Sequence, residues 1–304
     1  MSQFATGFPG LRRDEARGKL WADTSAGGFG RELERFYEAY LGGDLEPFAL
    51  EAEEAPGFYL FAERVAAGEI GGDAVALKGH VTGPFTMALS LLDQEGRAVL
   101  HSPQLADAIV KLVTLKARWQ VERLRAAAPG LPVIVFLDEP YLTTYGSAQS
   151  TLSAEDVVST ISEVAQALTV DGVEVGVHCC GRTDWSLLLA TPLSILNFDA
   201  YEYAGTVALY PREVEAFLQR GGYLAWGVVP SSLPTPEAVE KETLDSLAER
   251  LEDGIRGLVR AGTSEALVRN QLLVTPSCGT AGMRPELAAK SLSLATALAE
   301  RLRG

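Results

Sequence analysis

Three residues of types that can bind metal ions, one histidine and two cysteines, lie where predicted strands end. His178 and Cys180 flank one residue in the run VHCCG, and Cys278 lies in the later run TPSCG. Residues two apart in an extended strand point to the same face, so His178 and Cys180 share a face. Cys179 points the other way and is expected to be a small buried apolar residue. Because imidazole nitrogen and thiolate sulfur together favour Zn²⁺, the pattern predicts a zinc site at His178, Cys180 and Cys278.

Two acids are candidates for a further zinc ligand. Asp199 ends a predicted strand on the same face as Asn197, and Glu202 follows three residues later. Carboxylate oxygens bind zinc, but Asp199 could instead make a supporting hydrogen bond, and Glu202 could be a solvated loop acid. Side-chain alternation points Asp199 inward and favours it, while Glu202 remains the competing ligand.

Asp138, Glu139, Thr82 and Gly83 are candidates for substrate binding. Asp138 and Glu139 follow an apolar strand, where a carboxylate can hold a substrate ammonium or act as a general base. The alternative is a loop acid before a proline. Thr82 and Gly83 follow another strand, and glycine lets a ligand approach the backbone closely, although a tight turn explains it equally well.

Short β-branched runs alternate with longer segments of helical period, which is typical of a parallel sheet with helices outside it. Seven strands are predicted, at Phe4–Phe8, Ala74–Gly79, Val133–Leu137, Val173–His178, Ile195–Asp199, Tyr223–Val228 and Leu272–Thr275, with Phe58–Phe61 a candidate for an eighth. Ser153, with Asp156 three residues later, predicts a helix start. Thr235 and Pro236 predict another, whose leucine stripe ends at Gly262 and packs in the core.

These elements predict an α/β fold, a single-domain (β/α)8 TIM barrel over residues 1–304, with its active site at the C-terminal ends of the strands. The length of 304 residues also allows two domains, but no repeat or linker divides the chain. Three cysteines are too few for a disulfide framework. No nucleophilic serine elbow, phosphate-binding loop or dinucleotide fingerprint occurs, which weakens hydrolase, kinase and dehydrogenase interpretations.

The charge of the chain bears on its partners and location. Lys and Arg number 26 against 40 Asp and Glu, a formal charge of −14. Such a chain repels phosphate groups, so neither nucleic acid nor an anionic membrane is an expected partner. It lacks a signal-peptide layout and an apolar run of about 20 residues, so a cytoplasmic location is expected. Nothing in the sequence indicates the oligomeric state.

Five runs in this order resemble the catalytic barrel of cobalamin-independent methionine synthase and its relatives in the uroporphyrinogen decarboxylase superfamily. They are VTGPFT (81–86), FLDEP (136–140), VHCCG (177–181), NFDAY (197–201) and TPSCG (275–279). The resemblance implies zinc on His178, Cys180, Cys278 and an acid. Matching strand ends selects Asp199 as that acid, whereas the family's spacing favours Glu202. It also implies catalytic roles for His178 and for Asp138, which would bind the amino group of homocysteine.

The implied activity is zinc-dependent transfer of a methyl group to a small-molecule thiol, homocysteine above all, giving methionine. The chain is too short to include the second barrel that helps the full-length enzymes hold a folate donor. Methylcobalamin or a methylated corrinoid protein is therefore the expected donor. Three alternatives stay open: a corrinoid:coenzyme M type of methyltransferase, a metal-free decarboxylase, and a non-catalytic zinc module. The decarboxylase would need a basic cleft, for which the early cluster is Arg12, Arg13 and Arg17.

Overall fold

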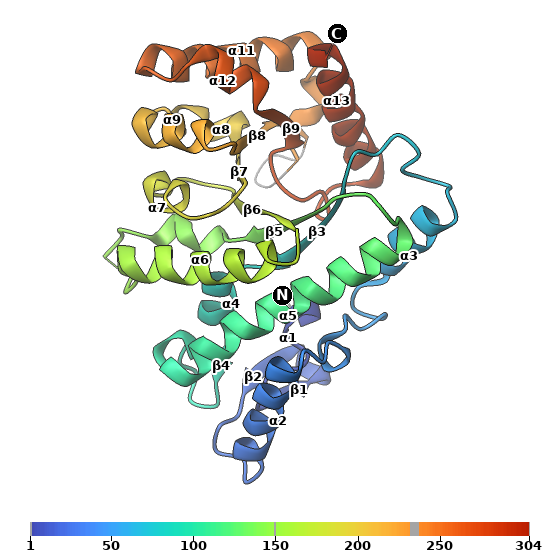
Figure 1. Ribbon diagram of the computed structural model, residues 1–304, viewed down its shortest axis with the longest axis vertical. Helices are drawn as coiled ribbons and strands as arrows, with labels where there is room; N and C mark the ends of the chain where they lie inside the picture. The colour runs from blue at the N-terminus through green and yellow to red at the C-terminus, as the bar shows by residue number, and fades with distance from the viewer. Residues whose placement is uncertain (1, 149, 232–236, 304) are drawn as a thin grey trace. The chain divides into compact units, whose positions relative to one another are not determined.

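The computed structural model describes residues 2–148, 150–231 and 237–303. The chain divides into two compact units: the first comprises Met1–Tyr141 and Ser159–Val175, and the second Leu142–Val158 and Gly176–Gly304. Figure 1 traces the elements of both from blue to red. The helix α6 (Ala154–Thr169) and the strand β6 (Glu174–Cys179) each begin in one unit and end in the other. A single domain over residues 1–304 stays a prediction.

The first unit contains two small groups of strands and a long helix. Its elements are α1 (Ser2–Ala5), β1 (Leu11–Asp14), η1 (Glu15–Arg17), β2 (Lys19–Ala22), α2 (Phe29–Gly42), η2 (Glu46–Phe48), α3 (Pro56–Ala66), β3 (Leu77–Thr82), α4 (Pro84–Ser90), β4 (Leu92–Asp93), η3 (Val99–His101), α5 (Pro103–Ala127) and β5 (Val133–Asp138). The strands β1 and β2 pair antiparallel, and β2 pairs parallel with β4. The strands β3 and β5 pair in parallel, with Thr82 opposite Asp138 at their carboxyl ends.

Alternation along β3 explains how this parallel pair is packed. Leu77, Gly79 and Val81 are buried, whereas Lys78 and His80 between them are exposed. The buried residues face α5, whose apolar side chains form much of the core of the first unit. This packing fixes the carboxyl ends of β3 and β5, where the predicted substrate-binding residues lie.

The second unit is built on parallel strands that alternate with helices. After η4 (Pro140–Thr144), which begins in the first unit, its elements are α7 (Trp185–Leu189), β7 (Ile195–Phe198), α8 (Ala200–Val207), α9 (Pro211–Gln219), β8 (Tyr223–Val229), α10 (Ala238–Lys241), α11 (Leu244–Ala261), α12 (Glu265–Asn270), β9 (Leu272–Pro276) and α13 (Pro285–Arg303). The strands pair in the order β6, β7, β8, β9. Their carboxyl ends therefore meet at one edge.

Aromatic rings and a leucine stripe hold this sheet to its helices. Phe198 on β7 meets Trp226 on β8 edge to face, with ring centroids 5.1 Å apart. A Cβ on Gly254 of α11 would lie 2.6 Å from the Trp226 ring, so glycine is needed for the helix to approach β8. Most of the predicted stripe is buried, at Leu247, Leu251, Ile255 and Leu258.

The predicted helix starts and stops can be checked in part. Ser153 Oγ accepts a hydrogen bond from Asp156 N at 3.0 Å, which confirms the predicted cap of α6. The helix α11 ends, as predicted, at Gly262, whose φ of 115° is left-handed. It begins at Leu244 after the capping residue Thr243. Thr235 and Pro236, the predicted start, lie outside the described residues.

Five predicted strands are confirmed within a few residues: β5, β6, β7, β8 and β9. The strand predicted at Ala74–Gly79 is displaced to Leu77–Thr82. Phe4–Phe8 is wrong, because α1 occupies its start and Gly7, with φ of 91°, turns the chain. Phe58–Phe61 is also wrong: it lies inside α3, which starts with Pro56, a favoured first helical residue.

The fold is therefore a mixed α/β fold with parallel strands followed by helices. The described residues form six strands of this kind, β3, β5, β6, β7, β8 and β9, rather than the eight of the predicted closed barrel. The two missing strands correspond to segments where aromatic residues belong to helices. Apolar side chains at a helix surface and in a short strand differ only in period, so brief aromatic runs are ambiguous.

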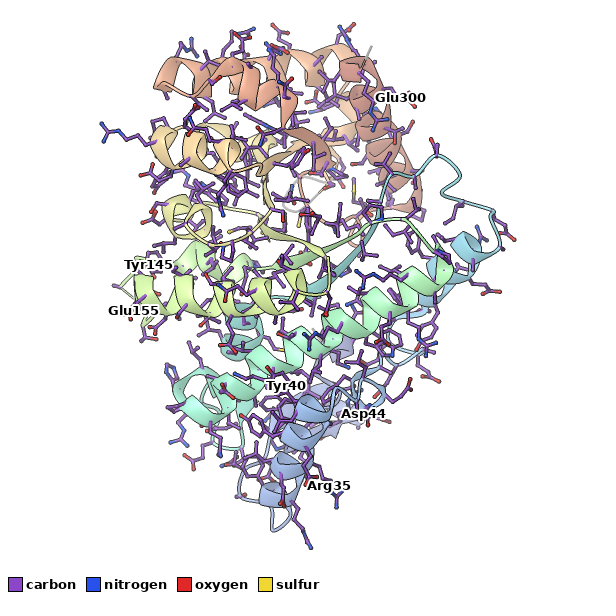
Figure 2. The ribbon with its side chains drawn as sticks, viewed as in Figure 1. Arg35, Tyr40, Asp44, Tyr145, Glu155 and Glu300 are labelled. Atoms are coloured by element: carbon purple, nitrogen blue, oxygen red, sulfur yellow. The ribbon has the colours of Figure 1, made fainter. Side chains whose placement is uncertain are left out.

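The surface reflects the acidic composition. Asp44, Glu155 and Glu300, labelled in Figure 2, have exposed side chains. Of the helices that the structure describes, none is both long enough and apolar enough to cross a bilayer.

Candidate metal centre

The three predicted metal ligands come together in the second unit. One ligand atom from each of His178, Cys180 and Cys278 lies within 4.8 Å of the others. In a tetrahedral zinc site, bonds of about 2.1 Å to nitrogen and 2.3 Å to sulfur place ligand atoms about 3.5–3.8 Å apart. A contraction of about 1 Å from the 4.8 Å limit, within reach of side-chain rotation, gives that geometry.

Parallel pairing explains this convergence. His178 lies on β6 opposite Asn197 of β7, and Cys180 follows the last residue of β6. Cys278 comes two residues after Pro276, which ends β9. Because carboxyl ends of neighbouring parallel strands share an edge, residues separated by about a hundred positions in the chain meet there. Cys179 is completely buried and is not part of this group, as the side-chain alternation predicts.

The orientation of His178 is fixed by Asn197. His178 Nδ1 lies 2.6 Å from Asn197 Oδ1. The Asn197 amide nitrogen donates to the Ala225 carbonyl at 2.8 Å and to Thr275 Oγ1 at 2.9 Å, so its oxygen is the acceptor toward His178. The network therefore places a proton on Nδ1, so Nε2 is the nitrogen that would bind a metal ion after losing its own proton.

The two thiols influence each other strongly. A hydrogen bond from Cys180, followed by one from His178, lowers the pKa of Cys278 to about 4. The same contact with Cys278, followed by burial, raises the pKa of Cys180 above its ordinary value. The two shifts have the directions expected when the two sulfurs share one proton. A divalent cation that bound both sulfurs would take the place of the shared proton.

The turn after Cys180 depends on a glycine. A Cβ on Gly181 would lie 2.7 Å from Cγ2 of Thr143, so a larger residue would displace one of the two segments. Thr183 Oγ1 donates to the Leu142 carbonyl at 2.8 Å and joins the same segments. These contacts fix the backbone that carries Cys180.

The two candidate acids lie outside the three-residue cluster. Asp199 is buried and caps α8, because its Oδ1 accepts a hydrogen bond from Glu202 N at 2.9 Å. Burial raises the pKa of Asp199 to about 6. Glu202 is exposed and lines a groove of about 620 Å³ between α8 and α11. A role for either acid as a zinc ligand stays a prediction.

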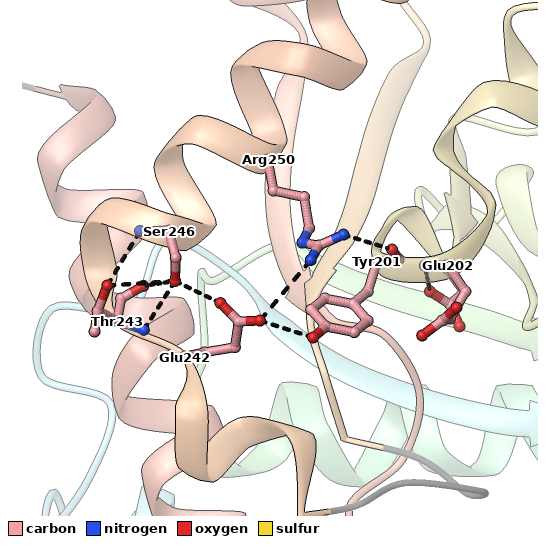
Figure 3. Close-up of polar contacts among 7 residues, drawn as sticks. Tyr201, Glu202, Glu242, Thr243, Ser246 and Arg250 are labelled. Atoms are coloured by element: carbon pink, nitrogen blue, oxygen red, sulfur yellow. Dashed lines mark hydrogen bonds and ion pairs between the residues drawn. The ribbon is translucent and has the colours of Figure 1, made fainter.

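Figure 3 shows how the first turn of α8 is held against α11. Tyr201 donates its hydroxyl proton to Glu242 Oε1 at 2.7 Å. Arg250 stacks over the Tyr201 ring, 4.1 Å from its centroid, and donates to the Tyr201 carbonyl at 3.2 Å. The backbone around Asp199 and Glu202 is therefore fixed by contacts on the helical side of the sheet.

The predicted substrate-binding residues lie in the first unit, where Glu139 has a different role. Its side chain is completely buried at the start of α4. Oε1 accepts a hydrogen bond from Phe85 N at 2.9 Å, and Oε2 accepts from Thr86 N at 2.8 Å and Thr86 Oγ1 at 2.7 Å. Because donors of the chain itself occupy both carboxylate oxygens, Glu139 holds the start of α4 in place. The sequence had predicted a substrate contact for this residue.

Gly83 belongs to the same junction. A Cβ at this position would lie 2.4 Å from Cδ of Glu139, so glycine makes room for the carboxylate. Gly83 is thus required for internal packing against Glu139, a reason that differs from both ligand approach and the tight turn considered from the sequence.

Asp138 differs from its neighbour Glu139. Its side chain is half-buried at the end of β5, opposite Thr82 of β3. Among the residues that the structure describes, none donates a hydrogen bond to its carboxylate or forms an ion pair with it. Asp138 and Thr82 therefore remain candidates for substrate binding in the first unit.

No protein-family model and no curated protein sequence matches this chain.

One residue important to the cluster was only partly visible in the sequence. Alternation places Asn197 on the inward face of β7, but its bond to His178 depends on the register between β6 and β7. A polar residue within an apolar strand is the signal that marks it.

Proposed function

We propose that this chain is a zinc-dependent methyltransferase that transfers a methyl group to a thiol, with homocysteine the favoured acceptor. We further propose that it is a relative of the catalytic barrel of cobalamin-independent methionine synthase and that its six described parallel strands belong to a TIM-like fold. The observation that carries the proposal is the convergence of His178, Cys180 and Cys278 within 4.8 Å. The family resemblance supports the choice of reaction.

The chemistry of these donors fits zinc. Asn197 orients His178 so that Nε2 is the nitrogen that would bind a metal, and the two cysteines supply sulfur ligands. Three protein ligands leave one position of a tetrahedral ion for an exchangeable group. Bound zinc would keep an acceptor thiol, whose pKa is otherwise about 8.5, in its nucleophilic thiolate form at neutral pH.

The methyl donor is proposed from the resemblance alone. Methylcobalamin or a methylated corrinoid protein would provide the methyl group, and the corrinoid protein would then be a partner. A corrinoid:coenzyme M type of methyltransferase is the second candidate, because it shares the same kind of metal centre and differs in the acceptor thiol.

The early arginines favour methyl transfer over decarboxylation of an acidic substrate. Arg12 pairs with Glu32 at 2.9 Å, and Arg17 with Asp14 at 3.7 Å. Arg13 forms an ion pair with Glu54. Since Arg12 and Arg13 are already paired with carboxylates, only the exposed Arg17 would be left for a polyanion, which weakens the decarboxylase alternative.

The test is a thiol-dependent demethylation assay on the purified protein. Zinc content is measured first, and methylcobalamin is then incubated with homocysteine or mercaptoethanesulfonate while its absorbance is followed. We expect about one zinc per chain and faster demethylation with homocysteine. Preference for the sulfonate would favour the coenzyme M type. A protein without bound metal would contradict the proposal.

Cobalt substitution separates an enzyme from a non-catalytic zinc module. With Co²⁺ in the site, a thiol that enters the coordination shell should change the visible spectrum. An unchanged spectrum, together with no demethylation, would indicate a site that is closed by a fourth protein ligand.

A further inference from the structure

Ser231, in the loop that follows β8, makes two hydrogen bonds to the backbone of Cys278. Its Oγ donates to the Cys278 carbonyl at 2.7 Å and accepts from the Cys278 amide at 2.9 Å. The Ser231 side chain is 1% exposed, so water does not compete for these bonds. We propose that Ser231 is a positioning residue that fixes Cys278 for metal binding, an inference that rests on the proposed zinc site.

Further hydrogen bonds continue the pairing of β8 and β9 up to Cys278. Ser277 N donates to the Val229 carbonyl at 2.7 Å, and Ser231 N donates to Ser277 Oγ at 3.2 Å. This pairing follows a register shift between Gly227 and Val229. The segment that carries Cys278 is thus joined to the end of β8 by a short buried network of two serines.

The need for such a network follows from where each ligand lies. His178 is within β6 and Cys180 directly follows it, so the strand ladder limits their movement. Cys278 lies beyond the end of β9 and has no ladder of its own. The Ser231 hydroxyl binds both polar backbone groups of Cys278, which restricts the peptide on each side of its Cα. A short side chain with one rotatable carbon–carbon bond makes this restraint stiff.

The decisive variant is Ser231→Ala, which removes one oxygen atom. Loss of a group that orients a metal ligand typically weakens metal binding by about 10–100-fold, and we expect an increase of that size in the zinc dissociation constant. With Co²⁺ in the site, the thiolate-to-cobalt charge-transfer band should also change. Ser231→Thr keeps the hydroxyl and should restore both properties.

Ser291→Ala is the matched control. Ser291 is completely buried and its Oγ donates to the Pro230 carbonyl at 3.3 Å, one residue before Ser231. The Ser291→Ala variant therefore removes a buried hydroxyl from the same neighbourhood without removing a hydrogen bond to Cys278. Its zinc dissociation constant should stay within about twofold of the wild-type value.

A second measurement does not depend on metal. In the metal-free protein, iodoacetamide alkylation of Cys278 and Cys180 is followed by peptide mass spectrometry. Ser231→Ala should change the rate at Cys278 several-fold relative to Cys180, whereas Ser291→Ala should not. Equal zinc binding, cobalt spectra and alkylation in Ser231→Ala and wild type would overturn the inference, as would equal effects of the two alanine variants. If the wild type binds no zinc, the proposed function fails, and the alkylation rates still decide whether Ser231 positions Cys278.

Discussion

Glu139 in the first unit and the His178, Cys180 and Cys278 cluster in the second both stand at the carboxyl ends of parallel strands. The two carboxylate oxygens of Glu139 accept three hydrogen bonds from groups of its own chain. In the cluster, one nitrogen and two sulfur atoms converge within 4.8 Å of one another. The same position in a strand thus serves internal structure in one unit and a candidate binding site in the other. What separates the two is the set of partners that surround each polar atom.

The largest expected effect is loss of a metal ligand. Structural zinc sites with four protein ligands bind with about 10–16 kcal/mol, so one ligand accounts for about 2.5–4 kcal/mol, a factor of about 10²–10³ in affinity. Cys278→Ala should therefore lose zinc during dialysis, as measured by elemental analysis, while its circular dichroism is unchanged. The buried neighbour Cys179 provides the control, and Cys179→Ala should retain zinc. Full zinc occupancy in Cys278→Ala would remove this residue from the site.

Removal of Glu139 tests the other side of the comparison. Glu139→Ala leaves three buried donors around Phe85 and Thr86 without their acceptor. An unsatisfied buried group costs about 1–3 kcal/mol, and the surrounding structure relaxes in part. We therefore expect a loss of about 2–4 kcal/mol in the free energy of unfolding. Urea denaturation measures this loss, and zinc content should be unaffected. A loss below about 0.5 kcal/mol would show that water or another group replaces the carboxylate.

Asp138 provides a smaller and more selective effect. If it binds the acceptor's ammonium, the charge-assisted hydrogen bond contributes about 1.5–3 kcal/mol, or about 10–100-fold in acceptor affinity. Asp138→Asn should raise the KM for homocysteine by that factor and leave mercaptoethanesulfonate, which has no amino group, unchanged. Zinc occupancy is the internal control. An equal effect on both thiols would contradict ammonium recognition.

A further expected effect is a change in the pH dependence of stability. Burial outweighs the hydrogen bonds to Glu139 and raises its pKa to about 7. A glutamate in the unfolded chain has a pKa of about 4.3, so between these pH values the folded state keeps a proton that the unfolded state releases. The free energy of unfolding therefore falls as pH rises from about 4.3 to about 7, and levels off above.

Glu139→Gln removes this titration. Its urea denaturation midpoints at pH 5 and pH 7.5 should differ by less than those of the wild type, after allowance for its lower overall stability. If the two midpoints of Glu139→Gln differed by as much as those of the wild type, other groups would cause the pH dependence. Asp199, whose pKa burial raises to about 6, contributes a slope of the same sign.

The sequence was informative where a period or a spacing determines structure. Alternation placed His178 and Cys180 on one face and Cys179 on the other, and the stripe of α11 ended where predicted. It was uninformative where the outcome depends on contacts between distant segments. The bond from Asn197 to His178 requires the register of two strands, and the burial of Glu139 requires α4 to begin beside it. Neither can be obtained from local pattern.

Local pattern also failed where two elements share a composition. Phe58–Phe61 is rich in aromatic residues that favour strands, yet Pro56 starts a helix there. The same limit applies to Ser231, an ordinary loop residue whose importance comes from a contact with Cys278, 47 positions away. The residues of the cluster could thus be predicted from the sequence, whereas those that hold them in place could not.

The closeness of Cys180 and Cys278 has a consequence for redox chemistry. Thiolates, which react with oxidants far faster than thiols, are favoured here by the lowered pKa of Cys278. A second sulfur within 4.8 Å can then resolve an oxidised cysteine as a disulfide. Such a bond would join the segments after β6 and β9 and remove two metal ligands at once. Bound zinc would protect both sulfurs, so formation of this disulfide should be confined to protein without bound metal.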